Sequence, residues 1–209
     1  MSQDRSGLVN IAALAAGMVV FGLCAHREIL IIPRIAALAV ASLAVVRGIT
    51  MSREPRSLLG FCGFYSRRAI FVPLCIVLGV GLGIYYRYRQ GRPLLPDALT
   101  YMCFVSAAIG LCEEVIYRGF VQGGLRRYGV VVAVLGGAAA HTVYKCSLFV
   151  LPDSSVRADI LWLGIATFAT GILFGVMRER WGSLLFPVVF HVAFDVTAYA
   201  DVQTLPWWL

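Results

Sequence analysis

The stretch ALTYMCFVSAAIGLCEEVIYRGFV, residues 98–121, is long and apolar enough to cross a membrane, yet it contains Glu113, Glu114 and Arg118. A transmembrane helix needs about 20 predominantly apolar residues. Ionisable groups inside such a segment cost free energy, and they persist where they are paired or used in function. The stretch therefore predicts a membrane-embedded fold and also indicates where its chemistry lies.

The composition of the whole chain supports a membrane environment. Of its 209 residues, 60% are hydrophobic and only 14% are charged, and the mean hydropathy is +0.82. A soluble domain is typically about 45–50% apolar and about 25% charged. Because a chain this short leaves much of its surface exposed, the excess apolar residues have to face lipid.

Seven segments are candidates for membrane-spanning helices, and six to eight spans are compatible with the pattern. The seven are Leu8–Ala25, Leu30–Val46, Ala69–Tyr86, Ala98–Val121, Val130–Tyr144, Ile160–Met177 and Leu184–Ala200. The chain shows no alternating strand pattern and no internal repeat. We therefore expect an all-α, polytopic helix bundle of about seven spans. It would form a single integral membrane domain over residues 1–209, with a catalytic core at approximately 98–200.

The basic residues gather in the short segments between the apolar runs, where they would touch anionic lipid headgroups. If the N-terminus lies on the cytoplasmic side, ten of these basic residues lie in cytoplasmic loops and six in outer loops. An excess of basic residues in the cytoplasmic loops favours that orientation. We expect a prokaryotic cytoplasmic membrane and no binding to nucleic acid. The inner set is Arg5, Arg47, Arg53, Arg56, Arg67, Arg68, Arg126, Arg127, Arg178 and Arg180; the outer set is Arg27, Arg87, Arg89, Arg92, Lys145 and Arg157.

The carboxylate doublet is the first candidate for chemistry. Glu114 and Arg118 are four residues apart, so on an α-helix they can pair on one face, while Glu113 points about 100° away. Two adjacent carboxylates in a low dielectric cannot both ionise cheaply. A carboxylate in that situation can accept a proton from water. A purely structural network of ion pairs between helices is equally compatible with this pattern.

Two further spans carry histidines. His191 and Asp195 are four residues apart and can face one cavity, and His141 lies near the end of another span. At about 1.5 Å per residue, Glu113, His141 and His191 lie roughly 20, 18 and 14 Å from the predicted cytoplasmic face. Rare polar groups at similar depth on three helices indicate a shared site.

These residues resemble a known family. Glu113-Glu114-Val-Ile-Tyr-Arg118 resembles the EExxxR motif of the CAAX prenyl endopeptidase and bacteriocin-processing (CPBP) family of glutamate-type intramembrane proteases. His141 is similar to its second motif, FxxxH, and His191-Val-Ala-Phe-Asp195 to its third, HxxxN. The resemblance covers about 85 residues in the family's order. It implies a helix bundle with a hydrolytic site that opens sideways to lipid.

The resemblance also implies roles. Glu113 and His141 would activate the attacking water, and Glu114 and Arg118 would brace the site. His191 and Asp195 would bind the oxyanion. The sequence departs from the family at two positions, with Gly137 in place of the Phe and Asp195 in place of the Asn. Since an ionised Asp195 would repel an oxyanion, we expect it to orient His191 by accepting an N–H.

We therefore expect an intramembrane endopeptidase that cleaves near a terminus of a membrane-tethered protein. The substrate would be a prenylated CAAX-type chain, a C-terminal sorting tag or a leader peptide. No cofactor is predicted. One alternative is a zinc enzyme with Glu113, His141 and His191 as ligands. A serine protease using Ser183 is weaker, since no GxSxG surrounds it. A non-catalytic membrane adaptor or immunity protein of the same fold is also compatible.

Overall fold

The computed structural model describes residues 2–25, 30–61, 69–151 and 159–202, and within them every regular element is a helix. The predicted all-α, polytopic fold is confirmed. Of the loop arginines counted above, Arg27, Arg67, Arg68 and Arg157 lie outside the described residues.

Five described helices are long and apolar enough to cross a membrane: Ser6–Cys24, Ile31–Thr50, Phe71–Arg89, Val130–Ser147 and Ile160–Trp181. The last expected span corresponds to a shorter apolar helix, Leu185–Tyr199. The expected span 98–121 contains α5 (Met102–Glu113) and the π-helix η3 (Glu114–Val121), and the short helix α6 (Gln122–Leu125) follows it directly. About seven spans therefore remains compatible with the fold, but one is not a plain α-helix.

The chain divides into two compact units, and each combines two separate stretches of sequence. Unit 1 is Met1–Gly60 with Ile116–Val176, and unit 2 is Phe61–Val115 with Met177–Leu209. The division falls after Val115 in η3 and after Val176 in α8 (Ile160–Trp181). Neither unit is therefore a continuous stretch of the chain.

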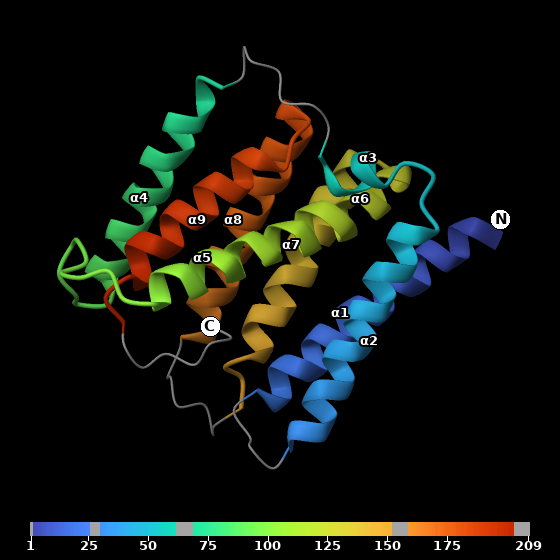
Figure 1. Ribbon diagram of the computed structural model, residues 1–209, viewed down its shortest axis with the longest axis horizontal. Coiled ribbons are helices and arrows are strands. Elements are labelled where there is room, and N and C mark those ends of the chain that lie inside the picture. Colours follow the sequence, from blue (N-terminus) through green and yellow to red (C-terminus); the bar gives the residue numbers. More distant parts are fainter. Residues whose placement is uncertain (1, 26–29, 62–68, 152–158, 203–209) are drawn as a thin grey trace. The chain divides into compact units, whose positions relative to one another are not determined.

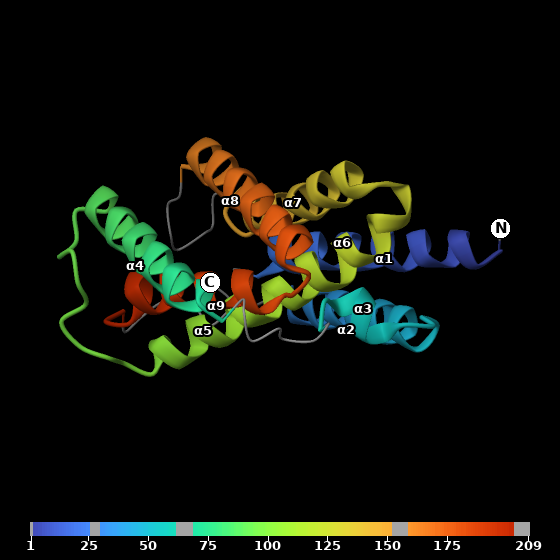
Figure 2. The same ribbon diagram turned by 90° about the horizontal axis from the view of Figure 1, so that it is seen from above.

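In unit 1, α1 (Ser2–Cys24) packs along α2 (Ile31–Thr50), and the two lie side by side in Figures 1 and 2. A Cβ at Gly17 would lie 2.8 Å from the carbonyl oxygen of Ala37, so glycine permits this close approach. The short helix α3 (Pro55–Leu59), the 3₁₀-helix η4 (Arg126–Tyr128) and α7 (Val130–Ser147) complete the unit with α6 and most of α8. Helix α7 also packs on α1.

In unit 2, α9 (Leu185–Tyr199) contacts both α4 (Phe71–Arg89) and α5, and α4 and α9 lie side by side in Figure 1. A Cβ at Gly79 would collide with the carbonyl oxygen of Phe190, and one at Gly83 would lie 3.1 Å from that of Phe194. Small residues on α4 thus bring its backbone against that of α9. This packing fixes α9, which carries His191 and Asp195.

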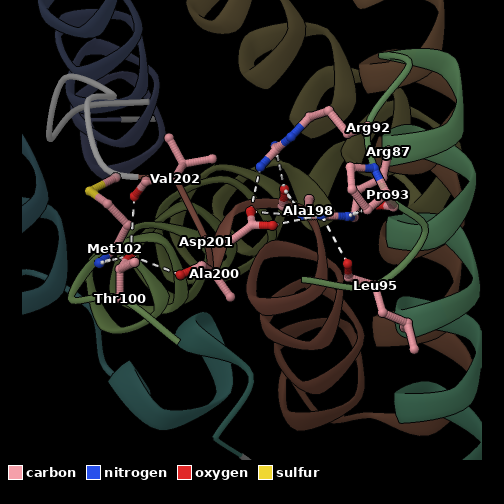
Figure 3. Close-up of polar contacts among 10 residues, drawn as sticks. All are labelled: Arg87, Arg92, Pro93, Leu95, Thr100, Met102, Ala198, Ala200, Asp201 and Val202. Carbon is pink, nitrogen blue, oxygen red and sulfur yellow. Dashed lines mark hydrogen bonds and ion pairs between the residues drawn. The ribbon is translucent and has the colours of Figure 1, made fainter. Parts of the chain in front are cut away.

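The carboxyl ends of α4 and α9 are joined by an arginine clasp, formed by Arg87, Arg92 and Asp201 (Figure 3). Arg87 was grouped with loop residues from the sequence, but it is wholly buried. It donates to both carboxylate oxygens of Asp201, at 2.9 and 2.7 Å, and to the carbonyl oxygens of Pro93 and Leu95. Arg92 also donates to Asp201 and, at 3.0 Å, to the Ala198 carbonyl at the end of α9.

The clasp makes stability depend on pH. The hydrogen bonds and charge of Arg87 hold the pKa of Asp201 at about 2, below its ordinary 3.8. A lowered folded-state pKa stabilises the fold above about pH 4 and ceases to do so as pH falls through about 2. Since the Asp201 side chain is only 13% exposed, the shift corresponds to about 2 kcal/mol.

We predict that Asp201→Asn lowers the free energy of unfolding by about 2 kcal/mol at pH 7. The difference from the parent should shrink as pH falls from about 4 to about 2, as followed by thermal unfolding in detergent. Asp159→Asn is the matched control, because Asp159 accepts a hydrogen bond from Trp162 N that asparagine can also accept. Equal stability of Asp201→Asn and the parent at pH 7 would contradict the clasp's role.

Candidate active site

Four of the six predicted site residues belong to unit 2. Glu113 ends α5 and Glu114 begins η3, while His191 and Asp195 lie one turn apart on α9. Since α9 packs on α5, the four side chains come together in one cluster. All are buried, with exposures of 4%, 0%, 8% and 6% in that order.

His191 is the centre of this carboxylate cluster. Its Nδ1 lies 2.8 Å from Glu114 Oε1. Because an ionised carboxylate only accepts hydrogen bonds, we assign the proton to Nδ1, which donates to Glu114. Its other nitrogen, Nε2, lies 3.8 Å from Glu113 Oε2 and 3.7 Å from Asp195 Oδ2. The acceptor that orients His191 is thus Glu114, whereas the sequence favoured Asp195.

The carboxylate cluster depends on Gly110, a residue that the sequence reasoning missed. A Cβ at Gly110 would collide with Asp195 Oδ2 and lie 3.3 Å from His191 Cδ2. Gly110 and Ser106, four residues apart on α5, are both buried. This small-xxx-small spacing is typical of close helix contacts in membranes, and it was the available signal.

The other two predicted residues, Arg118 and His141, meet in unit 1. Arg118 Nη1 lies 2.8 Å from His141 Nδ1. Because a guanidinium only donates, His141 Nδ1 must accept, and its ring proton must be on Nε2. Tyr117, also missed from the sequence, stacks on His141 with ring centroids 4.6 Å apart. Arg118 also lies over the Phe174 ring, at 5.4 Å. His141 is therefore fixed in both ring orientation and tautomer.

The local backbone differs from the prediction. Glu114 and Arg118 were expected to lie on an α-helix, but both residues lie in the π-helix η3. Their expected pairing stays a prediction. In a π-helix the backbone hydrogen bonds join residues five apart instead of four. Beyond η3, Gln122 donates to the Gly175 carbonyl at 3.0 Å, which ties α6 to α8.

The described part of the chain contains no group of three or more His, Cys, Asp or Glu side chains that could hold a metal ion. Ser183 accepts a hydrogen bond from the backbone N–H of Leu185 at 3.2 Å. It precedes His191 by eight residues, or roughly 12 Å along a helix. Ser183 thus helps to start α9 and does not adjoin the imidazole.

The close contact at Gly110 yields a stability prediction. Gly110→Ala should destabilise unit 2 by about 1–3 kcal/mol, because the new methyl group displaces Asp195 and His191. Gly81→Ala is the matched control, since Gly81 is helical and nothing lies within 4 Å of its Cβ position. That variant should be neutral or more stable by up to about 1 kcal/mol. Thermal unfolding of both in detergent measures the difference, and loss of stability in Gly81→Ala alone would contradict the assignment.

The tautomer of His141 yields a second prediction. With ¹⁵N-labelled histidine, His141 Nδ1 should give the shift of an unprotonated ring nitrogen and Nε2 that of an N–H. Arg118→Ala should abolish this preference, whereas Arg118→Gln, which retains an N–H donor, should preserve part of it. The chain has three histidines, so His→Gln variants assign the signals. A protonated Nδ1 on His141 in the parent would overturn the hydrogen-bond assignment.

The comparisons with known proteins agree with the motifs. The family described as type II CAAX prenyl endopeptidase Rce1-like matches residues 94–197, a segment that contains all six predicted site residues. No curated protein and no solved structure matches the chain. The match confirms the resemblance drawn from the three motifs. Residues 94–197 are therefore similar to the Rce1-like family of type II CAAX prenyl endopeptidases, which are membrane proteases.

Proposed function

We propose that this multi-pass membrane protein is an intramembrane endopeptidase that uses water as the nucleophile and forms no covalent intermediate. The observation that carries the proposal is the carboxylate cluster in unit 2, where Glu113 Oε2 lies 3.8 Å from His191 Nε2. The match of residues 94–197 to a protease family supports the reaction class. Buried ionisable groups within apolar helices are generally functional, which supports it further.

Glu113 is the proposed general base. The 3.8 Å between Glu113 Oε2 and His191 Nε2 exceeds a hydrogen bond, but one water oxygen can lie about 2.8 Å from both atoms. A water held in this way has one proton directed at the carboxylate. In the reaction, Glu113 takes that proton as the water oxygen attacks the peptide carbonyl carbon.

His191 is the proposed oxyanion donor. We assign it the doubly protonated form in this step, with Nδ1–H donating to Glu114 and Nε2–H to the developing oxyanion. One such donor contributes about 3–4 kcal/mol to transition-state stabilisation elsewhere. When the tetrahedral intermediate collapses, the carbon–nitrogen bond breaks and the proton held by Glu113 passes to the leaving amine. The products are a new carboxyl terminus and a new amino terminus, and Glu113 is ionised again.

The remaining residues have positioning roles in this proposal. Glu114 fixes the His191 ring through Nδ1, and Asp195, at 3.7 Å from Nε2, counters its charge. Arg118 fixes the tautomer of His141. The share of His141 in activating the water, which the family pattern implies, stays a prediction.

The substrate we propose is a membrane-tethered protein cleaved near a terminus. A prenylated CAAX-type C-terminus, a C-terminal sorting tag and a leader peptide are the three candidates. We also propose that the N-terminus lies on the cytoplasmic side, because the arginine distribution favours it, and that no metal takes part. A zinc enzyme using Glu113, His141 and His191 is the chemical alternative, and its activity would be lost on chelation.

The test is proteolysis by the full chain in membranes. We predict that Glu113→Gln lowers the cleavage rate by about a hundred-fold or more, because the amide cannot accept the proton, while the thermal unfolding midpoint stays close to that of the parent. Glu179→Gln is the control, since Glu179 is in unit 2 and ion-pairs with Arg178. A farnesylated CAAX peptide serves as the defined probe, and mass spectrometry of new protein termini in membranes covers the other substrates.

The outcomes separate the alternatives. More than a tenth of the parent rate in Glu113→Gln removes Glu113 from the role of base. Loss of activity with 1,10-phenanthroline, and its recovery with zinc, identifies a metalloenzyme. If neither the peptide nor any membrane protein terminus depends on Glu113, the chain is a non-catalytic member of the fold.

A further inference from the structure

Unit 1 contains a cavity that lies outside the residues assigned to proteolysis. It has a volume of about 540 Å³ and lies among the first turns of α1, the end of α2, and α6 with η4. Its lining includes two arginines, Arg53 and Arg127, together with Ser6, Asn10 and Ser52. Cavities of about 300–1,000 Å³ are the usual size of ligand sites.

The charge of this cavity is positive. A second cavity, of about 460 Å³, shares Ser52 and Arg127 with the first and adds Arg126 and Glu54. Together their linings carry three arginines and one glutamate, a net charge of 3 − 1 = +2. A Cβ at Gly7 would lie only 2.9 Å from Arg127 Nη2. The absence of a side chain at Gly7 thus lets the Arg127 guanidinium lie directly against α1.

Asn10 provides an independent observation. It lines the cavity and is only 3% exposed, yet its side chain makes no hydrogen bond to any part of the chain that the structure describes. A buried amide normally has a partner, the more so in a membrane protein. Asn10 is four residues beyond Ser6, where the first candidate span begins. This places it roughly 6 Å into the span, near the level of lipid headgroups and glycerol.

The cavity also has an apolar side, formed by Ile11, Met51, Leu58 and Phe120. A free phosphate ion would make no favourable contact with these apolar side chains, whereas the glycerol and the upper part of a lipid acyl chain would pack on them. Arginine side chains at the end of membrane helices are typical partners of anionic headgroups.

We propose that this cavity is a binding site for one anionic phospholipid. Arg53 and Arg127 bind its phosphate oxygens, the Asn10 amide hydrogen-bonds to the phosphate or glycerol ester, and the apolar side holds the start of an acyl chain. The site is independent of the proposed proteolysis, because it uses none of the residues assigned to that reaction.

The test compares lipids on the purified full chain in detergent. Titration with phosphatidylglycerol should raise the thermal unfolding midpoint of the parent well beyond the effect of phosphatidylcholine, and native mass spectrometry should retain one bound phosphatidylglycerol. For Arg53→Gln/Arg127→Gln, the phosphatidylglycerol concentration for half of the shift should rise about tenfold or more. Raising the salt concentration should weaken binding to the parent.

Arg89→Gln/Arg180→Gln is the matched control, because both arginines are exposed, belong to unit 2, and give the same loss of charge. This variant should bind phosphatidylglycerol as the parent does. Asn10→Leu should also weaken binding, and it serves as the second variant if the double arginine variant does not fold.

Three results would overturn the proposal. The first is an equal response of the cavity variants and the control, which means that any anionic lipid acts non-specifically. The second is an equal response of the parent to phosphatidylcholine, which removes the phosphate specificity. The third is a full shift with inorganic phosphate alone at millimolar concentration, which identifies a soluble phosphate ligand in place of a lipid.

Discussion

A polar group buried at the depth of the hydrocarbon core has to find its partner inside the protein, because lipid acyl chains supply none. Each buried ionisable cluster described here satisfies that requirement. His191 donates to Glu114 in unit 2, Arg118 donates to His141 in unit 1, and Arg87 binds Asp201 at the end of α4. These interactions hold long side chains in place that would otherwise be mobile. They also determine which ring nitrogen of His191 and of His141 carries a proton.

Those polar contacts exist only because small residues let the helices approach. Gly79 and Gly83 bring α4 against α9, and Gly110 makes room on α5 for the carboxylate of Asp195. Dispersion and close packing drive helix association in membranes, where the hydrophobic effect between helices is weak. The glycines are therefore part of the reason that four ionisable side chains can lie within one small volume.

Much of this could be read from the sequence, and the exceptions have physical causes. Composition and apolar length predicted the helical membrane fold, and four-residue spacing placed His191 and Asp195 on one face of α9. The partner of each histidine could not be predicted, because it depends on how separate helices pack. Arg87 resembled a loop residue by its position among other arginines, but the clasp buries it. No sequence pattern predicted that residues Glu114–Val121 would form a π-helix instead of an α-helix.

That π-helix, Glu114–Val121, also bears on how this segment tolerates length changes. A π-turn contains about one more residue than an α-turn. Deleting a single residue between Glu114 and Val121 would therefore allow the backbone to relax into an ordinary α-helix with every hydrogen bond remade. The product would insert into a membrane and stay helical, yet a different set of side chains would share a face with Tyr117 and Arg118. In this segment, insertions and deletions are a route to new arrangements that substitutions alone do not reach.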